Sequence, residues 1–143
     1  MLKPAEQTSL TALKLADLVV EAGFPAGVVN IITGNGHTAG DRMVKHPDVD
    51  KVAFTGSTEI GKLINRNATA TMKRVTLELG GKSPVVVMPD VDVAQTAPGV
   101  AGAIFFNAGQ VCVAGSRLYA HRSVYDQVLE GMTQTAPFWA PRA

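Results

Sequence analysis

The chain has 143 residues, of which 46% are hydrophobic and 17% charged, and its basic and acidic side chains nearly balance at a net charge of +1. It holds neither a basic run nor an apolar segment of about 20 residues, which argues against a nucleic-acid partner and against a membrane span. The single cysteine excludes an internal disulfide and multi-cysteine zinc sites, and the scattered histidines do not indicate a metal site.

The N-terminal part of the chain alternates between predicted helix and strand. The opening MLKPAEQTSL lacks the pattern of a secretion signal, which predicts a cytosolic or organelle-lumen site, and the unpaired thiol favours the cytoplasm. Apolar positions spaced about 3.6 residues apart predict a helix over residues 6–22. β-branched runs between turn residues predict strands over 28–33 and 51–56, and GNGHTAGDRMVKHP between them is expected to be a loop that enters a short helix.

A second helix is predicted directly after the strand that ends at residue 56. Ser57 or Thr58 can cap this helix, and Glu59 places an acid in its first turn, where the helix dipole favours negative charge. The sequence RVTLELGG that follows alternates apolar and polar residues and therefore predicts a half-exposed strand that ends at a pair of glycines.

The remaining segments continue the alternation. SPVVVMPD predicts a buried strand, and residues 92–106 predict a helix in which Pro98 and Gly99 suggest a kink or a late start. SRLYAH and SVYDQVLEGM predict a further strand and helix. Repeated alternation of this kind predicts an α/β fold with a mainly parallel sheet and right-handed crossovers.

The only cysteine, Cys112, lies in the small-residue stretch FFNAGQVCVAGSR just after the predicted helix. Such a loop is open to a planar substrate, and the backbone N–H groups around Ala114 and Gly115 could stabilise a thiolate or an oxyanion. The alternative is a small buried hydrophobe, which residue type alone favours. Whether Cys112 is a nucleophile or a core residue therefore has to be inferred from the surrounding motifs.

Glu78 and the segment FTGSTEIG supply this context. Glu78 is a carboxylate at the carboxyl end of a strand, where open α/β sheets place their sites, although it could equally be a solvated charge on an edge strand. FTGSTEIG is a strand end followed by a hydroxyl-rich helix N-terminus that favours phosphate, or else an ordinary capped helix. GNG at residues 34–36 is weaker, because it lacks the third glycine of the dinucleotide fingerprint.

Together, KPAEQTSLTAL, FTGSTEIG, LELGGKSP and FFNAGQVCVAGSR resemble the aldehyde dehydrogenase superfamily in their order, and the spacing of Glu78 and Cys112 is similar to the family's. The resemblance covers the chain up to about Met132. It implies that Cys112 is the nucleophile that attacks an aldehyde substrate and that Glu78 is the general base that activates water. It further implies NAD as cofactor, with NADP as an alternative, and a homo-oligomeric parent enzyme.

The resemblance also implies a set of cofactor contacts. Lys3 and Glu6 would hold the adenosine ribose, and Gly56 and Ser57 would lie against the pyrophosphate, since the family uses its GSTEIG turn in place of a GxGxxG loop. The further contacts that it implies are Gly36, Thr58, Glu59, Ile60, Gly61, Leu79 and Gly80.

In fold, the resemblance implies a Rossmann-like parallel sheet that binds the cofactor and leads into the start of the catalytic domain. Residues 1–80 would be part of the NAD-binding domain, and residues 81–132 would begin the catalytic domain with the nucleophile loop. Residues 133–143 would be a divergent tail, because Pro137 and Pro141 stop a helix that the family continues.

Full-length relatives are several-fold longer, so the chain is expected to be an internal segment of a longer enzyme. Three function classes stay open from the sequence. The chain is a segment of an enzyme that oxidises aldehydes, a remnant that binds nucleotide without turnover, or an inactive fragment that associates with full-length subunits.

Overall fold

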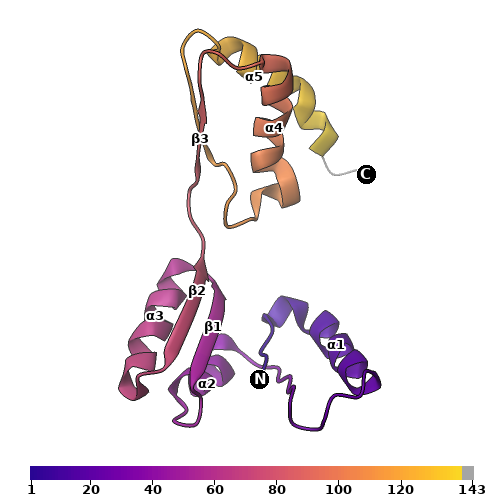
Figure 1. Cartoon of the computed structure of the whole chain (residues 1–143), viewed down its shortest axis with the longest axis vertical. Coiled ribbons are helices and arrows are strands. Elements are labelled where there is room, and N and C mark those ends of the chain that lie inside the picture. Colours follow the sequence, from indigo (N-terminus) through magenta and orange to yellow (C-terminus); the bar gives the residue numbers. More distant parts are fainter. Residues whose placement is uncertain (140–143) are drawn as a thin grey trace. The chain divides into compact units, whose positions relative to one another are not determined.

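The computed structural model describes residues 1–139, whose helices and strands Figure 1 shows in sequence colours. The chain divides into two compact units. The N-terminal unit comprises residues 1–55 and 59–77, and the C-terminal unit comprises residues 56–58 and the chain from residue 78 onward. Helices and strands alternate throughout, so the predicted α/β class is confirmed. Within residues 1–139, no helix is long and apolar enough to cross a membrane.

The elements up to residue 79 follow the predicted order, except that residues 28–33 form no strand. They are η1 (Glu6–Thr8), α1 (Ser9–Glu21), the π-helical turn η2 (Gly36–Gly40), α2 (Asp41–Lys45), β1 (Lys51–Gly56), α3 (Thr58–Ala68), η3 (Thr69–Thr71) and β2 (Arg74–Leu79).

Strands β1 and β2 form a two-stranded sheet that α3 connects. The N–H of Arg74 donates to the carbonyl of Asp50 at 3.1 Å, and the N–H of Gly80 donates to the carbonyl of Gly56 at 3.3 Å, so the strands run in the same direction. Along β2, exposed and half-buried residues alternate as predicted, and Glu78 is among the exposed ones. The alternation therefore leaves the polar face of β2 in solvent.

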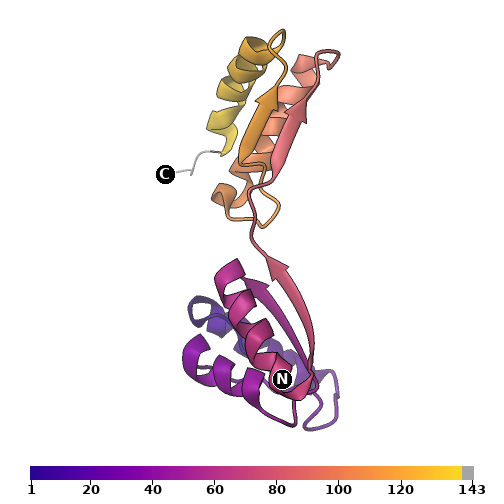
Figure 2. The same ribbon diagram turned by 90° about the vertical axis from the view of Figure 1, so that its left-hand side faces the viewer.

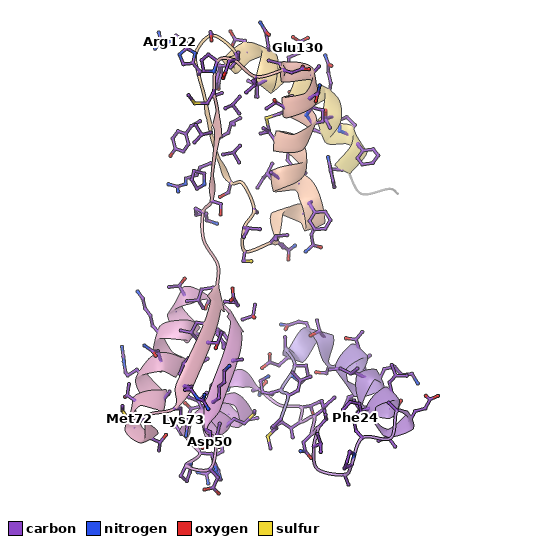
Figure 3. The ribbon with its side chains drawn as sticks, viewed as in Figure 1. Phe24, Asp50, Met72, Lys73, Arg122 and Glu130 are labelled. Carbon is purple, nitrogen blue, oxygen red and sulfur yellow. The ribbon has the colours of Figure 1, made fainter. Side chains whose placement is uncertain are left out.

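One buried charged side chain stands out in the N-terminal unit. Lys73, just before β2, is 9% exposed, and its ammonium group donates to the backbone carbonyl of His46. Figure 3 shows Lys73 beside the sheet with Asp50 and Met72 nearby. The hydrogen bond ties the segment after α2 to the start of β2.

The elements from residue 84 onward belong to the C-terminal unit. They are β3 (Pro84–Val87), α4 (Val93–Phe105), η4 (Phe106–Gly109), β4 (Arg117–Ala120), α5 (Tyr125–Thr135) and η5 (Ala136–Trp139).

Strands β3 and β4 are parallel, and α4 and α5 pack on one face of their sheet (Figure 2). Val87 pairs with Ala120, and Val87 is buried with Val100 of α4 and Val128 of α5. Helices α4 and α5 approach each other so closely that a Cβ placed on Gly131 would lie 2.7 Å from the Cβ of Ala97. This small core fixes the position of α4, which leads to the cysteine.

Three expectations from the sequence differ from the structure. Residues 28–33 form no strand but a single bridge between Ile31 and Leu2, since only the short segment at Leu2 pairs with them. The strand predicted as buried is open on one face, where Val86 is 65% exposed. Helix α4 does not start late: it begins at Val93, because the side chain of Asp92 caps the N–H groups of Ala94 and Gln95.

Helix α5 ends at Thr135, and Pro137 lies in the short turn η5 that follows it. The stop predicted near Pro137 is therefore observed. Pro141 lies outside the described residues.

Candidate active site

The cysteine loop begins with an unusual turn at the end of α4. Asn107, Ala108 and Gly109 all have positive φ, at 50°, 55° and 74°, a conformation that non-glycine residues seldom adopt. The N–H of Gln110 donates to the carbonyl of Asn107 at 3.0 Å and closes the turn. The chain then reaches Cys112, whose free thiol is exposed. The structure does not fit the alternative of a buried core cysteine.

The segment after Cys112 is fixed against α4 and β3. The N–H of Gly115 donates to the carbonyl of Ala103 at 2.9 Å. A Cβ on Gly115 would lie 2.5 Å from Cγ2 of Val85, so the backbone approaches β3 more closely than any side chain would allow. This contact holds the C-terminal side of the loop in place.

The hydrogen bonds of the loop correct one expectation. The N–H groups of Ala114 and Gly115 were expected to stabilise an oxyanion, but they donate to the carbonyls of Val111 and Ala103. Within residues 1–139, no hydrogen bond is found for the N–H groups of Cys112 and Val113. These two donors, and not the predicted pair, are available to a negative charge beside the thiol.

Glu78 and the double glycine lie at the end of β2, in the same unit as Cys112. A Cβ on Gly81 would lie 3.9 Å from the backbone carbonyl oxygen of Cys112, an ordinary van der Waals contact, so this glycine is a neighbour of the cysteine loop. Glu78 is exposed. In the described residues, no hydrogen bond joins its carboxylate to Cys112, whose thiol is exposed as well.

The turn at residues 56–58 is held by Gly80. The N–H of Gly80 donates to the carbonyl of Gly56, and the hydroxyl of Thr58 donates to the carbonyl of Gly80 at 3.4 Å. The structure thus brings together three of the predicted cofactor contacts, and half-buried Leu79 precedes Gly80. The other residues of this motif are Ser57 before α3 and Glu59, Ile60 and Gly61 in its first turn.

Lys3, Glu6 and Gly36 form a second cluster, in the N-terminal unit. The N–H of Gly36 donates to Oε1 of Glu6 at 2.7 Å, and Nζ of Lys3 lies 3.8 Å from the same oxygen. Nζ of Lys3 also donates to the carbonyls of Pro4 and Gly34, at 2.7 and 2.9 Å. The backbone N–H of Glu6 itself, and then that of Gly36, lower the pKa of the Glu6 carboxyl, which favours the charged form.

This cluster offers both a cation and a carboxylate to a ligand that carries hydroxyl groups. The ammonium of Lys3 has three N–H donors, two of which are directed to carbonyl oxygens. The Glu6 carboxylate is half-exposed and has a second oxygen as an acceptor. A cation and a carboxylate 3.8 Å apart suit neighbouring hydroxyl groups that both donate and accept.

Sequence reasoning missed an apolar pocket beside the cysteine. Its volume is about 300 Å³, and its lining residues are Gly102, Ala103, Phe106, Val111, Val113 and Ala114. The alternation of valines on both sides of Cys112 was the available signal, but which helix face they meet depends on the fold. Among residues 1–139, no cluster of three or more potential metal ligands occurs.

Comparisons with known proteins agree with these features. A model of the aldehyde dehydrogenase family matches residues 1–139. The chain is 60% identical over 130 residues to phenylacetaldehyde dehydrogenase of Pseudomonas fluorescens. This match covers 91% of this chain and 26% of the relative. It is 53% identical over 137 residues to cytosolic aldehyde dehydrogenase 1 of Mus musculus, covering 95% of this chain and 27% of the relative. The chain therefore spans about a quarter of the length of these curated relatives.

A solved structure gives the same result in three dimensions. The P. syringae indole-3-acetaldehyde dehydrogenase AldA, solved as a cysteine-to-alanine mutant in complex with NAD⁺ and IAA, superposes with a TM-score of 0.94 at 47% identity. The match covers 98% of this chain and 29% of that one.

Proposed function

The chain belongs to the aldehyde dehydrogenase family, and from this premise we propose that the protein it forms part of oxidises an aldehyde to a carboxylic acid. NAD is the proposed cofactor, with NADP as an alternative. The observation that carries the proposal is the exposed thiol of Cys112, on a loop held between α4 and β3. The acceptor and donor groups around this loop suit each stage of the reaction.

In the first stage, the thiolate of Cys112 attacks the carbonyl carbon of the aldehyde. A sulfur–carbon bond forms, and the carbonyl π electrons move to oxygen. The N–H groups of Cys112 and Val113, for which the described residues offer no partner, can donate to this oxyanion. When bound, the cofactor supplies the acceptor for the hydride that leaves the tetrahedral carbon. The acyl group then remains on Cys112 as a thioester.

In the second stage, Glu78 acts as a general base. Its carboxylate takes a proton from water, the water oxygen attacks the thioester carbon, and the carbon–sulfur bond breaks to release the acid and the Cys112 thiolate. A general base must come within about 3 Å of that water. The exposed position of Glu78, on the polar face of β2 and close to the Gly80–Gly81 pair, suits this role.

Cofactor binding is assigned to the two clusters described above. We propose that Lys3 and Glu6 bind the adenosine ribose and that Gly56 and Ser57 lie against the pyrophosphate, at the start of α3. The remaining contacts are proposed at Gly36, Thr58, Glu59, Ile60, Gly61, Leu79 and Gly80. Support comes from the family match and from the solved NAD⁺ complex of a relative.

The domain assignments are proposals of the same kind. Residues 1–80 would be part of a Rossmann-like NAD-binding domain, residues 81–132 the start of the catalytic domain, and residues 133–143 a divergent tail. A cytoplasmic location and a homo-oligomeric assembly are proposed for the whole protein. The free thiol supports the first of these, as does the cytosolic relative from mouse.

A chimera tests the proposed function. The matching segment of the Pseudomonas fluorescens relative is replaced by this chain's residues, and NADH formation with phenylacetaldehyde is measured. Turnover is expected, with loss of at least about 10³-fold in Cys112→Ala, since the covalent step disappears. A chimera that binds NAD with unchanged affinity but shows no Cys112-dependent turnover would favour a nucleotide-binding role without catalysis.

A further inference from the structure

The tail after α5 contacts two of the residues that line the pocket beside Cys112, Gly102 and Phe106. Trp139, the only tryptophan of the chain, is half-buried. A Cβ on Gly102 would lie 3.3 Å from Cζ2 of Trp139, so the indole occupies the space that the glycine leaves open on α4. Gly102 is also a wall of the pocket.

A second contact links Trp139 to Phe106. The rings of Phe106 and Trp139 are edge to face, with centroids 6.3 Å apart and planes at 87°. The rings of Phe138 and Trp139 are also edge to face, with centroids 5.5 Å apart and planes at 85°. We call Phe106, Phe138 and Trp139 the aromatic clamp. Edge-to-face pairs of this kind attract through their ring quadrupoles in addition to the area that they bury.

Phe106 is the residue through which the clamp can act on the cysteine loop. It follows α4 directly and precedes the positive-φ residues Asn107 and Ala108. A backbone of this kind persists only where its surroundings hold it in place. The far side of the loop is fixed by Gly115 on α4 and β3. The near side is held at Phe106, which Trp139 contacts.

Hydrogen bonding does not explain the position of Trp139. Its indole N–H is buried and has no hydrogen-bond partner in the part of the chain that the structure describes. An unpartnered buried N–H opposes this placement. The contacts that the described residues give the indole ring are apolar, with Gly102, Phe106 and Phe138.

We propose that Trp139 is a positioning residue for the cysteine loop: it holds Phe106 and thereby shapes the apolar pocket beside Cys112. The sequence interpretation treated the tail only as a departure from the family. The proposal assigns the tail a role, and it rests on the proposed function in that Cys112 is taken as the reacting thiol.

The test uses the full chain and two maleimides that differ only in the substituent on nitrogen, N-methylmaleimide and N-benzylmaleimide. The rate with the benzyl compound divided by the rate with the methyl compound is measured for Cys112 and for N-acetylcysteine. The first ratio divided by the second measures how far the pocket favours an apolar substituent. Trp139→Ala is expected to lower this preference by roughly two- to tenfold, the range of an aromatic pair. Trp139→Phe should restore most of it, because a ring again lies over Gly102.

Phe24→Ala is the matched control, since Phe24 is an exposed aromatic in the N-terminal unit (Figure 3) and should leave the preference unchanged. An unchanged preference in a Trp139→Ala chain with native circular dichroism would overturn the proposal.

Fluorescence keeps the proposal testable if Trp139→Ala does not fold. The emission maximum of Trp139 in the native chain should be blue-shifted relative to that in urea. Phe106→Ala should make the Trp139 fluorescence more easily quenched by acrylamide. Native emission equal to that in urea, or acrylamide quenching unaffected by Phe106→Ala, would equally overturn it. These measurements need no turnover, so they can fail while the chimera remains active, and the chimera can fail while they succeed.

Discussion

At the scale of single residues, the account depends first on the accessibility of Cys112. Because its thiol is exposed in the structure, iodoacetamide should alkylate it in the native chain at a rate close to that in urea. Mass spectrometry of the labelled peptide measures both rates, with Cys112→Ala as the blank. Labelling that needs denaturant would show that the thiol is buried.

Glu6 is the residue on which cofactor choice depends. Its lowered pKa favours a carboxylate at neutral pH, which accepts a hydrogen bond from a ribose 2′-hydroxyl and repels a 2′-phosphate. We therefore expect the chimera to prefer NAD over NADP in kcat/KM. Glu6→Gln should reduce this preference by about tenfold, because it removes the charge and keeps the shape. Equal efficiency with both cofactors before the substitution would contradict the role of Glu6.

At the scale of elements, the cysteine loop depends on the contact of Gly115 with β3. Gly115→Ala places a methyl group 2.5 Å from Cγ2 of Val85, and we expect it to destabilise the C-terminal unit by about 1–3 kcal/mol. Urea unfolding followed by Trp139 fluorescence measures this loss. Gly99→Ala is the control, because no atom lies within 4 Å of its Cβ and alanine favours a helix by about 0.5–1 kcal/mol. Equal stability of the two variants would argue against the close contact.

The elements also show what the sequence could predict. The alternation in residues 74–79 is a local signal, and the strand that it predicts agrees with the structure. Residues 28–33 have equally strong β-forming composition but pair only at Ile31, because a strand needs a neighbour that composition does not reveal.

In the candidate site, too, the sequence reveals local features, whereas contacts between separate segments appear only in the structure. Cys112 and Glu78 are marked by local motifs. Two contacts join separate segments of the chain, so only the folded chain shows them. They are the hydrogen bond from Gly115 to Ala103 and the contact of Trp139 with Gly102. The first of these contacts occupies the N–H of Gly115, which the sequence left as a possible oxyanion donor.

At the scale of the whole molecule, large apolar side chains remain in solvent. Helix α1 buries no residue, and Leu10 and Val20 on it are 83% and 76% exposed. Parallel sheets are normally covered on both faces, yet Val86 of β3 and Tyr119 of β4 are 65% and 55% exposed. We therefore expect the purified chain to self-associate and to show little or no aldehyde oxidation by itself. Light scattering across a dilution series measures this, and a monodisperse monomer with Cys112-dependent turnover would be the contrary result.

In the proposed mechanism, Cys112 carries the acyl group and Glu78 is needed to release it. The most direct measurement is the mass of the Cys112 peptide from the chimera with Glu78→Gln, quenched in acid after mixing with NAD and phenylacetaldehyde. The account predicts one phenylacetyl thioester on Cys112 and a single burst of NADH per site, because hydride loss precedes the step that needs the base. An unmodified Cys112 peptide while NADH continues to form, or an acyl group on another residue, would contradict it.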